Sequence, residues 1–329
     1  MKKTIYIFSS GEIKREGNTL CFKGKDGKKF VPISLVSSLM ILGEVSLNKR
    51  LLEFLSSNEI LVHFFNYYGF YIGSFYPRSH HNSGFMTLKQ CEHYLNYDKR
   101  LKLARKFVEG AIKNMLKNVM YYNNRKGNLD ATLRLMEKSL TELPRVKSVE
   151  ELMAIEGHSR NGYYLSFDVI LNDEAYRYER RERRPPRTPL NTLLSFGNSL
   201  LYITVLSEIY KTHLDPRIGF LHSSNERRFS LNLDVAEVFK PILVDRIIFT
   251  LVNKKMLDPS CFMEELGGLY LNDKGRKIFV QQFESKLEQT IAYSNRMKCS
   301  YQRLIRLELY KLEKHLIGEK EYEPFIVRW

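Results

Sequence analysis

The first part of the chain alternates short apolar runs with glycines and charged turns. Three runs rich in β-branched and aromatic residues lie between residues 4 and 33, and this composition between turn residues predicts strands. Residues 46–59 have helical spacing instead, because their leucines recur on one face. The aromatic segment 60–77 returns to a strand pattern, with a hairpin turn expected at Gly69. The pattern therefore predicts a small β-rich domain with one helix.

The pattern of apolar residues changes after residue 77. Residues 78–87 are mostly polar and show no period, which is typical of a linker. Beyond them, apolar residues recur every three or four positions, as in helices. Helices are expected at about 148–178, 189–213, 231–256, 262–266, 275–292 and 300–316, besides a helical stretch from 89 to 140. The fold class expected is α+β: a β-rich domain (1–77), a linker (78–87) and a larger all-α domain (88–329).

The charge balance adds a class of partner. Lys and Arg number 52 against 37 Asp and Glu, so the formal net charge is +15. This excess favours a polyanion, either DNA, RNA or an anionic membrane face. One long uncharged stretch, 188–207, contains asparagines and hydroxyl groups that would be unfavourable in lipid, so a buried helix is expected rather than a membrane span.

The cysteines and the N-terminus bear on location. The 4 cysteines show no CxxC spacing, which gives no indication of a zinc or redox motif and is typical of a reducing compartment. The N-terminal apolar run is short and lacks a small-residue cleavage site, which argues against a signal peptide. A cytoplasmic protein is expected.

A histidine and two carboxylates could bind a divalent ion. His222 alone would usually be structural, but Asp234 and Glu237 follow it and share a helix face, where like charges repel unless a cation lies between them. Apolar residues surround them, so this face is not simply solvated. Such donors suit Mg²⁺ or Mn²⁺ better than zinc. By itself, Glu156 would be interpreted as a solvated glutamate near a helix end.

Residues 177–191 form an arginine-rich run. Six arginines against two glutamates give a local charge of 6 − 2 = +4, and a Pro-Pro pair keeps the segment extended. Two interpretations stay open: a solvated charge run, or a phosphate-binding segment that uses the bidentate geometry of arginine. Asn191 precedes an apolar helix and is interpreted first as its N-cap.

Together and in this order, these segments resemble the CRISPR-associated endonuclease-integrase of spacer acquisition, the universal first Cas protein. The helical domain has IEG around Glu156, RRERRPPRTPLNTLLSFGNSLLY, LDPRIGFLH and RFSLNLDVAEVFKP. The N-terminal pieces IFSSGEIKR and VHFFNYYGFYIGSFYPR match the β-domain of the family. The resemblance covers nearly the whole chain, and its details look most like members from type I systems, of subtype I-B.

The resemblance implies a β-sandwich-like N-terminal domain that makes a homodimer contact and an α-helical domain that binds Mg²⁺ or Mn²⁺. Carried onto this sequence, the catalytic residues and metal ligands are Glu156, His222 and Glu237. The supporting positions are Asp234, Lys240 and Asn191. The arginines expected to contact the DNA backbone are Arg180, Arg181, Arg183, Arg184, Arg187, Arg227 and Arg228.

Two positions depart from the family pattern. Some members have Asp where this chain has Glu237, which lengthens the carboxylate by one methylene and leaves the ligand chemistry unchanged. Many members have a Gly-Arg pair where this chain has Glu226, Arg227 and Arg228. The second departure concerns the conformation of that loop rather than the metal ligands.

The implied reaction is a transesterification in which a DNA 3′-OH attacks a phosphodiester at the edge of a CRISPR repeat. A dimer of the small second CRISPR acquisition protein is the implied partner. Two other classes remain. A metal-dependent nuclease that cleaves DNA or RNA without integration would use the same ligands. A catalytically inert nucleic-acid-binding scaffold would need the basic segments but not the acidic residues and the histidine.

Overall fold

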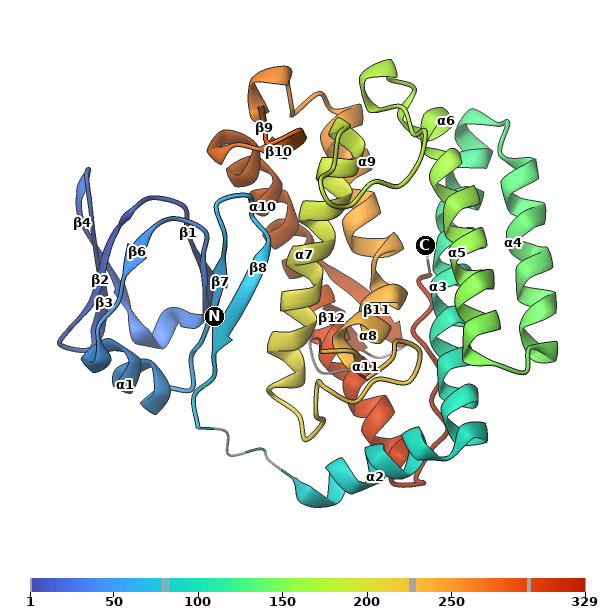
Figure 1. Cartoon of the computed structure of the whole chain (residues 1–329), viewed down its shortest axis with the longest axis horizontal. Coiled ribbons are helices and arrows are strands. Elements are labelled where there is room, and N and C mark those ends of the chain that lie inside the picture. Colours follow the sequence, from blue (N-terminus) through green and yellow to red (C-terminus); the bar gives the residue numbers. More distant parts are fainter. Residues whose placement is uncertain (1, 79–80, 82, 225–228, 295–296, 329) are drawn as a thin grey trace. The chain divides into compact units, whose positions relative to one another are not determined.

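The computed structural model describes residues 2–78, 81, 83–224, 229–294 and 297–328. The chain divides into two compact units, Met1–Asn82 and Ser83–Trp329 (Figure 1). The strands gather in the first unit and the helices dominate the second, which confirms the predicted α+β class.

The described residues of the N-terminal unit form two sheets of four strands each. In the first sheet, β8 is antiparallel to β7 and the other neighbours are parallel. Its order is β1 (Lys3–Ile7), β5 (Val36–Ile41), β7 (Leu61–Phe65) and β8 (Tyr71–Phe75). The order of the second sheet is β4 (Gly27–Pro32), β3 (Thr19–Gly24), β2 (Gly11–Glu16) and the short β6 (Val45–Ser46).

Both sheets and helix α1 (Lys49–Ser57) contribute to one hydrophobic core, in which Ile13 of β2 and Leu39 of β5 share a cluster with Leu51 of α1. The helix begins where the Asn48 side chain accepts a hydrogen bond from the Leu51 N–H at 3.0 Å. The expected turn at Gly69 joins β7 to β8, and its φ of 82° lies in the left-handed region. Over the described part of this unit, the predictions of a β-rich region with one α-helix and of this turn are confirmed.

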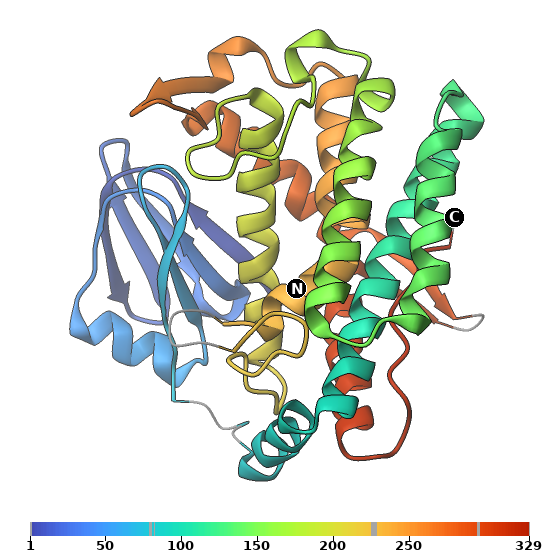
Figure 2. The same cartoon turned by 45° about the vertical axis from the view of Figure 1, so that its right-hand side comes forward.

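The second unit is a bundle of helices in which α3, α4 and α5 run side by side (Figures 1 and 2). Helix α2 begins within the segment expected as a linker. The helices are α2 (Gly84–Leu95), α3 (Tyr97–Lys126), α4 (Asp130–Glu142), α5 (Val149–Leu165), α6 (Phe167–Leu171), α7 (Pro189–Ile209), α8 (Leu231–Phe239), α9 (Arg246–Asn253), α10 (Asp273–Glu288) and α11 (Tyr301–Leu316). A π-helical segment, η4 (Pro241–Asp245), joins α8 to α9, and short 3-10 turns lie at Leu143–Arg145, Glu174–Tyr176 and Pro259–Cys261.

The second unit is mainly helical as predicted, but the prediction of a helix at 262–266 is wrong and strands are present as well. Two antiparallel hairpins lie within it: β9 (Phe262–Glu265) with β10 (Gly268–Leu271), and β11 (Thr290–Ser294) with β12 (Met297–Ser300). Leu266 and Gly267 have φ of 49° and 71°. Two consecutive left-handed residues reverse the chain in a tight hairpin, which a short apolar pattern does not reveal.

Helix α7 is the buried centre of this unit. It is long and apolar enough to cross a membrane, but 89% of its apolar window is buried inside the protein, as expected for a core helix. A Cβ at Gly197 would approach Phe279 and Val244 within 2.7 Å, so the glycine permits close packing of α7.

Polar side chains of α3 fix the neighbouring segments. The buried Asn114 amide donates to the carbonyls of Val238 and Phe325, both at 2.9 Å. Its oxygen accepts from the Val327 N–H at 3.0 Å. The C-terminal tail, expected to be irregular, is irregular over 319–328 but is held by hydrogen bonds to Asn114 of α3 and Glu308 of α11.

Candidate active site

The loop before α8 is built around Gly219. The Ser230 hydroxyl accepts from the Gly219 N–H and donates to the Arg217 carbonyl, both at 2.8 Å. A Cβ at Gly219 would lie 2.8 Å from Asp234 Oδ2 and equally close to the backbone of Ser230. The loop can therefore approach the first turn of α8 only because residue 219 has no side chain.

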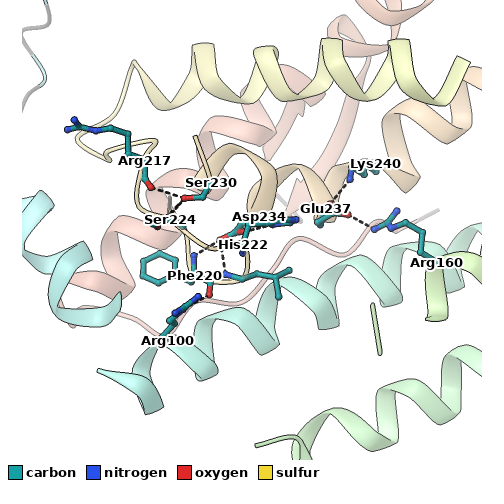
Figure 3. Close-up of polar contacts among 12 residues, drawn as sticks. Arg100, Arg160, Arg217, Phe220, His222, Ser224, Ser230, Asp234, Glu237 and Lys240 are labelled. Carbon is teal, nitrogen blue, oxygen red and sulfur yellow. Dashed lines mark hydrogen bonds and ion pairs between the residues drawn. The ribbon is translucent and has the colours of Figure 1, made fainter. Parts of the chain in front are cut away.

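The side-chain carboxylate of Asp234 holds this loop by accepting hydrogen bonds from the backbone N–H groups of the loop (Figure 3). Its buried Oδ2 accepts from the N–H groups of Phe220 at 2.5 Å and Leu221 at 3.0 Å. Its Oδ1 accepts from the N–H of His222 at 2.9 Å and faces the ring nitrogen Nδ1 of the same residue at 2.8 Å. A carboxylate only accepts, so Nδ1–H is the donor and Nε2 of the neutral ring keeps its lone pair.

Burial disfavours the charged form of His222, but the hydrogen bond and charge of Asp234 outweigh it. Together with the charge of Glu237, they raise the pKa of His222 above its ordinary value of 6.5. The ring is thus oriented by a buried anion, the arrangement commonly found behind metal-binding histidines.

Glu237 lies one turn after Asp234 on the same helix and is also buried. Arg160 of α5 donates to its Oε2 at 2.5 Å, and Lys240 forms an ion pair with its other oxygen. Burial favours the neutral acid, but the charges of Lys240 and Arg160 lower the pKa of Glu237 to about 2. The carboxylate is therefore ionised and enclosed by two cations (Figure 3).

Arg160 also connects the third predicted ligand. Its Nε forms an ion pair with Glu156, four residues earlier on the same face of α5. The Arg160 guanidinium, itself only 7% exposed, thus links Glu156 on α5 to Glu237 on α8. The sequence reasoning missed Arg160, although its spacing from Glu156 was the signal that could have revealed it.

The donor set fits a hard divalent ion in its chemistry. It comprises two carboxylates that share one cation and an imidazole with an available Nε2. As the side chains lie, no three His, Cys, Asp or Glu groups among the described residues are close enough to hold an ion. Positive charge already lies between the carboxylates, on Arg160, so an entering ion would take over that charge.

Lys240 belongs to the same charged cluster. It is 6% exposed, and its ammonium group lies 5.0 Å from the centroid of the Tyr202 ring on α7. Although burial opposes its charge, the Glu237 carboxylate raises the pKa of Lys240 above the ordinary value. Lys240 is therefore a permanent cation beside Glu237.

The arginine run does not behave as one unit. Arg181 is partly buried and donates to the Asn191 side chain at 2.9 Å and to the Ser195 hydroxyl at 3.0 Å, so its guanidinium is used within the fold. Of the arginines predicted to contact DNA, Arg180, Arg183, Arg184 and Arg187 are exposed, and Arg180 and Arg187 form ion pairs with Glu182. Arg227 and Arg228 lie outside the described residues.

Asn191 is not the N-cap of α7, contrary to the first interpretation. Thr188 caps the helix by accepting from the Asn191 N–H. The buried Asn191 side chain instead accepts from the Glu182 N–H at 3.2 Å and donates to the Arg180 carbonyl at 2.9 Å. Its position three residues after the cap brings it back to the arginine run, which it holds against α7.

Comparison with known proteins now identifies the family. The family model described as CRISPR associated protein Cas1 matches residues 5–285. A CRISPR-associated endonuclease Cas1 of Thermodesulfovibrio yellowstonii is 54% identical and covers 100% of both chains. Another, from Thermotoga maritima, is 49% identical over 97% of this chain and 98% of its own length.

Solved structures agree with this assignment. A Cas1 protein from Thermotoga maritima superposes with a TM-score of 0.88 at 48% identity, over 98% of this chain and 99% of that one. A casposase bound to integration product has a TM-score of 0.89 over 99% of this chain and 93% of its own, and its 22% identity shows the shared fold alone. The sequence matches and the Cas1 structure extend over both units, and the chain belongs to the CRISPR-associated Cas1 family.

Proposed function

We propose that this protein is a metal-dependent DNA endonuclease and integrase that inserts short DNA fragments into a CRISPR array. One observation carries the proposal: Asp234 orients His222 beside Glu237, which Arg160 links to Glu156. If Glu156 were only a solvated glutamate and His222 only a structural histidine, neither side chain would need these contacts with Arg160 and Asp234. The relatives with the highest identity reported above are named endonucleases, which supports the same chemistry.

The residues proposed to hold Mg²⁺ or Mn²⁺ are Glu156, His222 and Glu237. A bound divalent ion would neutralise charge on the attacked phosphate and favour ionisation of the oxygen nucleophile. Asp234 keeps the His222 ring in the tautomer with Nε2 available. Lys240 supplies a fixed positive charge beside Glu237, where the phosphate of the DNA would approach.

The joining step keeps the number of phosphodiester bonds constant. The 3′-oxygen of the incoming DNA bonds to phosphorus, the 3′-oxygen of the repeat strand leaves, and the proton of the attacking hydroxyl ends on the leaving oxygen. No external energy source is needed, because one phosphodiester is exchanged for another. When water replaces the 3′-OH, the same step becomes hydrolysis, so the site supports both integration and cleavage.

The DNA and protein partners follow from the same proposal. The exposed arginines 180, 183, 184 and 187 are proposed to contact phosphates, together with Arg227 and Arg228. The fold matches a chain of a Cas6-RT-Cas1–Cas2 complex with a TM-score of 0.86. We propose a homodimer through the N-terminal unit that binds a dimer of the small second acquisition protein in the cytoplasm.

The test is a joining assay with a 3′-OH DNA duplex, a supercoiled repeat plasmid and Mn²⁺, with and without the second acquisition protein. His222→Ala is expected to abolish joining and cleavage without unfolding the chain. His158→Ala is the matched control, because His158 is exposed and points from a different face of α5 than Glu156. Wild-type activity of His222→Ala would refute the ligand assignment.

The same assay separates the alternatives. Cleavage without joined products would favour a nuclease that only hydrolyses DNA or RNA. Binding without either product would favour the inert scaffold. Joined products that depend on the second acquisition protein would support the integrase.

The dimer has a test of its own. Exposed apolar residues of the N-terminal unit, among them Phe30 and Ile72 at 54% and 66% exposure, would be covered by a partner. Sedimentation of the full chain at micromolar concentration is expected to show a dimer, and a monomer would contradict this arrangement.

A further inference from the structure

The buried Arg160 guanidinium and the buried carboxyl group of Asp245 are left incompletely satisfied near the candidate metal ligands. Within the described part of the chain, Arg160 Nη1 has no hydrogen-bond partner, although Nε and Nη2 of the same guanidinium pair with Glu156 and Glu237. The carboxylate of Asp245, 1% exposed, has no hydrogen-bond partner on either oxygen among the described residues. Buried charges without partners are rare because desolvation strongly disfavours them.

The local backbone places Asp245 in the interior of the helical unit. Pro241 lacks the N–H that would continue α8, and the Asp245 N–H bonds to the carbonyl five residues earlier, at Lys240. This π-turn places Asp245 within the bundle, near the Tyr163 hydroxyl. Tyr163 follows Arg160 by three residues on α5, so both side chains lie on the same face of that helix. We infer that this face presents Arg160 both to the carboxylates of Glu156 and Glu237 and to Asp245.

The electrostatics are consistent with this geometry. Burial raises the pKa of Asp245 to about 7, and Arg160 is the charged neighbour that opposes this shift most strongly. Arg160 therefore lies within electrostatic range of Asp245 while its hydrogen bonds go to Glu156 and Glu237. A guanidinium has five N–H donors in a fixed plane, so a movement of the Arg160 side chain along α5 could exchange one carboxylate partner for another.

We propose that Arg160 is an internal counter-ion that competes with the divalent ion for Glu156 and Glu237 and moves to Asp245 when the ion binds. The inference rests on the proposed function, because it uses the same ligands. Without an ion, Arg160 keeps the half-buried Glu156 and the buried Glu237 from repelling one another. With an ion, the Asp245 carboxylate receives the displaced charge, so neither state leaves Arg160 unpaired. Arg160 and Asp245 are positioning residues that set the metal affinity rather than catalytic residues.

The test measures Mn²⁺ affinity without DNA, from the electron paramagnetic resonance signal of the free ion titrated with the full-length protein. Arg160→Gln removes the competitor and is expected to lower Kd at least about fivefold, the lower end of measured coupling between sites. Asp245→Asn removes the alternative partner and is expected to raise Kd by a similar factor. In the double variant, Asp245→Asn is expected to have no further effect on Kd, because no arginine remains that could pair with residue 245.

If Asp245 acted only through its charge, the effects of the two substitutions on Kd would be additive. If Asp245→Asn weakens Mn²⁺ binding equally with and without Arg160, Asp245 acts only through its charge and the inference is overturned. An unchanged or higher Kd in Arg160→Gln would also overturn it. Glu208→Gln is the matched control, since Glu208 is a buried carboxylate paired with Lys211 and Arg306, and its Kd is expected to equal the wild-type value.

The experiment also separates the inference from the proposed function. If the wild-type chain binds one Mn²⁺ that Glu156→Gln removes, the metal site stands and the variants decide the inference. If neither wild type nor Arg160→Gln binds Mn²⁺, both are overturned. Should Arg160→Gln fail to fold, Arg160→Lys keeps the buried charge but cannot bridge two carboxylates, and its Kd is expected to fall; Asp245→Asn, nearly identical in shape, tests the other half.

Discussion

Asp234 and Glu237 lie one turn apart on α8, and both are buried carboxylates, but they are held in different ways. Asp234 accepts from three backbone N–H groups and one imidazole of the loop 220–222. Glu237 is enclosed by two side-chain cations, Lys240 and Arg160. Backbone donors cannot leave without unfolding their loop, whereas long charged side chains can exchange partners by changing rotamers.

The difference assigns a role to each end of the site. The Asp234 end fixes the position of His222, and its hydrogen bonds persist whatever else binds. The Glu237 end is balanced by charges that another cation could replace. A metal site that must accept an ion after folding needs both properties, since one ligand must be oriented in advance and the others must be stable before the ion arrives.

Removing Asp234 should have the largest effect on stability. Asp234→Ala deprives three N–H groups of their acceptor, and hydrogen bonds to a charged group contribute about 1.5–3 kcal/mol each. The free energy of unfolding is expected to fall by at least about 3 kcal/mol, measured by urea denaturation with EDTA present. Asp273→Ala, an acidic residue 62% exposed in its side chain on α10, should lose less than about 1 kcal/mol. A similarly small loss for Asp234→Ala would remove the basis of the comparison.

Glu237 should show a loss of stability that a second substitution can reverse. Glu237→Gln leaves the buried Lys240 ammonium without its anion, and breaking a buried ion pair typically costs about 3–5 kcal/mol. Adding Lys240→Met removes the uncompensated cation and should restore most of this loss in the same urea experiment. If the two single losses simply add in the double variant, the cations are not exchangeable partners of Glu237. No single second substitution is expected to restore Asp234→Ala.

Two glycines offer a matched pair of smaller size. Gly219→Ala places a methyl group against Asp234 and the Ser230 backbone, and such overpacking costs about 1–3 kcal/mol. Gly157→Ala, next to Glu156 on α5, meets nothing within 4 Å and should stabilise the helix by about 0.5–1 kcal/mol. The melting temperatures of the two variants should therefore move in opposite directions. A fall for both would show that Gly157 has a packing role that its surroundings do not explain.

The elements that could be predicted from the sequence are those with a strong local period. Helices α7 and α11 and the strands of the N-terminal unit follow hydrophobic spacing that needs no tertiary information. The hairpin β9–β10 could not be predicted in this way, because two left-handed residues determine it. The π-helical segment Pro241–Asp245 could not be distinguished from the helices on either side either, because it lies in a continuous apolar run.

The site shows the same division. The i, i+3 spacing of Asp234 and Glu237 predicted a shared helix face, and both lie on α8 as expected. That spacing could not show that Asp234 would turn to a loop while Glu237 would face another helix. The spacing of Arg160 from Glu156 could suggest their pairing but not the ion pair of Arg160 with Glu237 on α8, and Asn191 was misassigned because Thr188 was the better cap. Such partners arise from tertiary packing, which a linear pattern does not contain.

The arginine run extends the comparison to the surface, with the smallest expected effect. Arg181, bonded to Asn191 and Ser195, should behave like Asp234: Arg181→Ala loses stability but leaves the salt dependence of DNA binding unchanged. Arg183→Ala removes an exposed charge, so stability is retained and the slope of log K against log salt should decrease by about 0.9 for one lost phosphate contact. Fluorescence anisotropy at several salt concentrations measures both slopes. A change of slope for Arg181→Ala alone would mean that the partly buried arginine leaves the fold to contact DNA, and that side-chain partners at this surface exchange as freely as those proposed around Glu237.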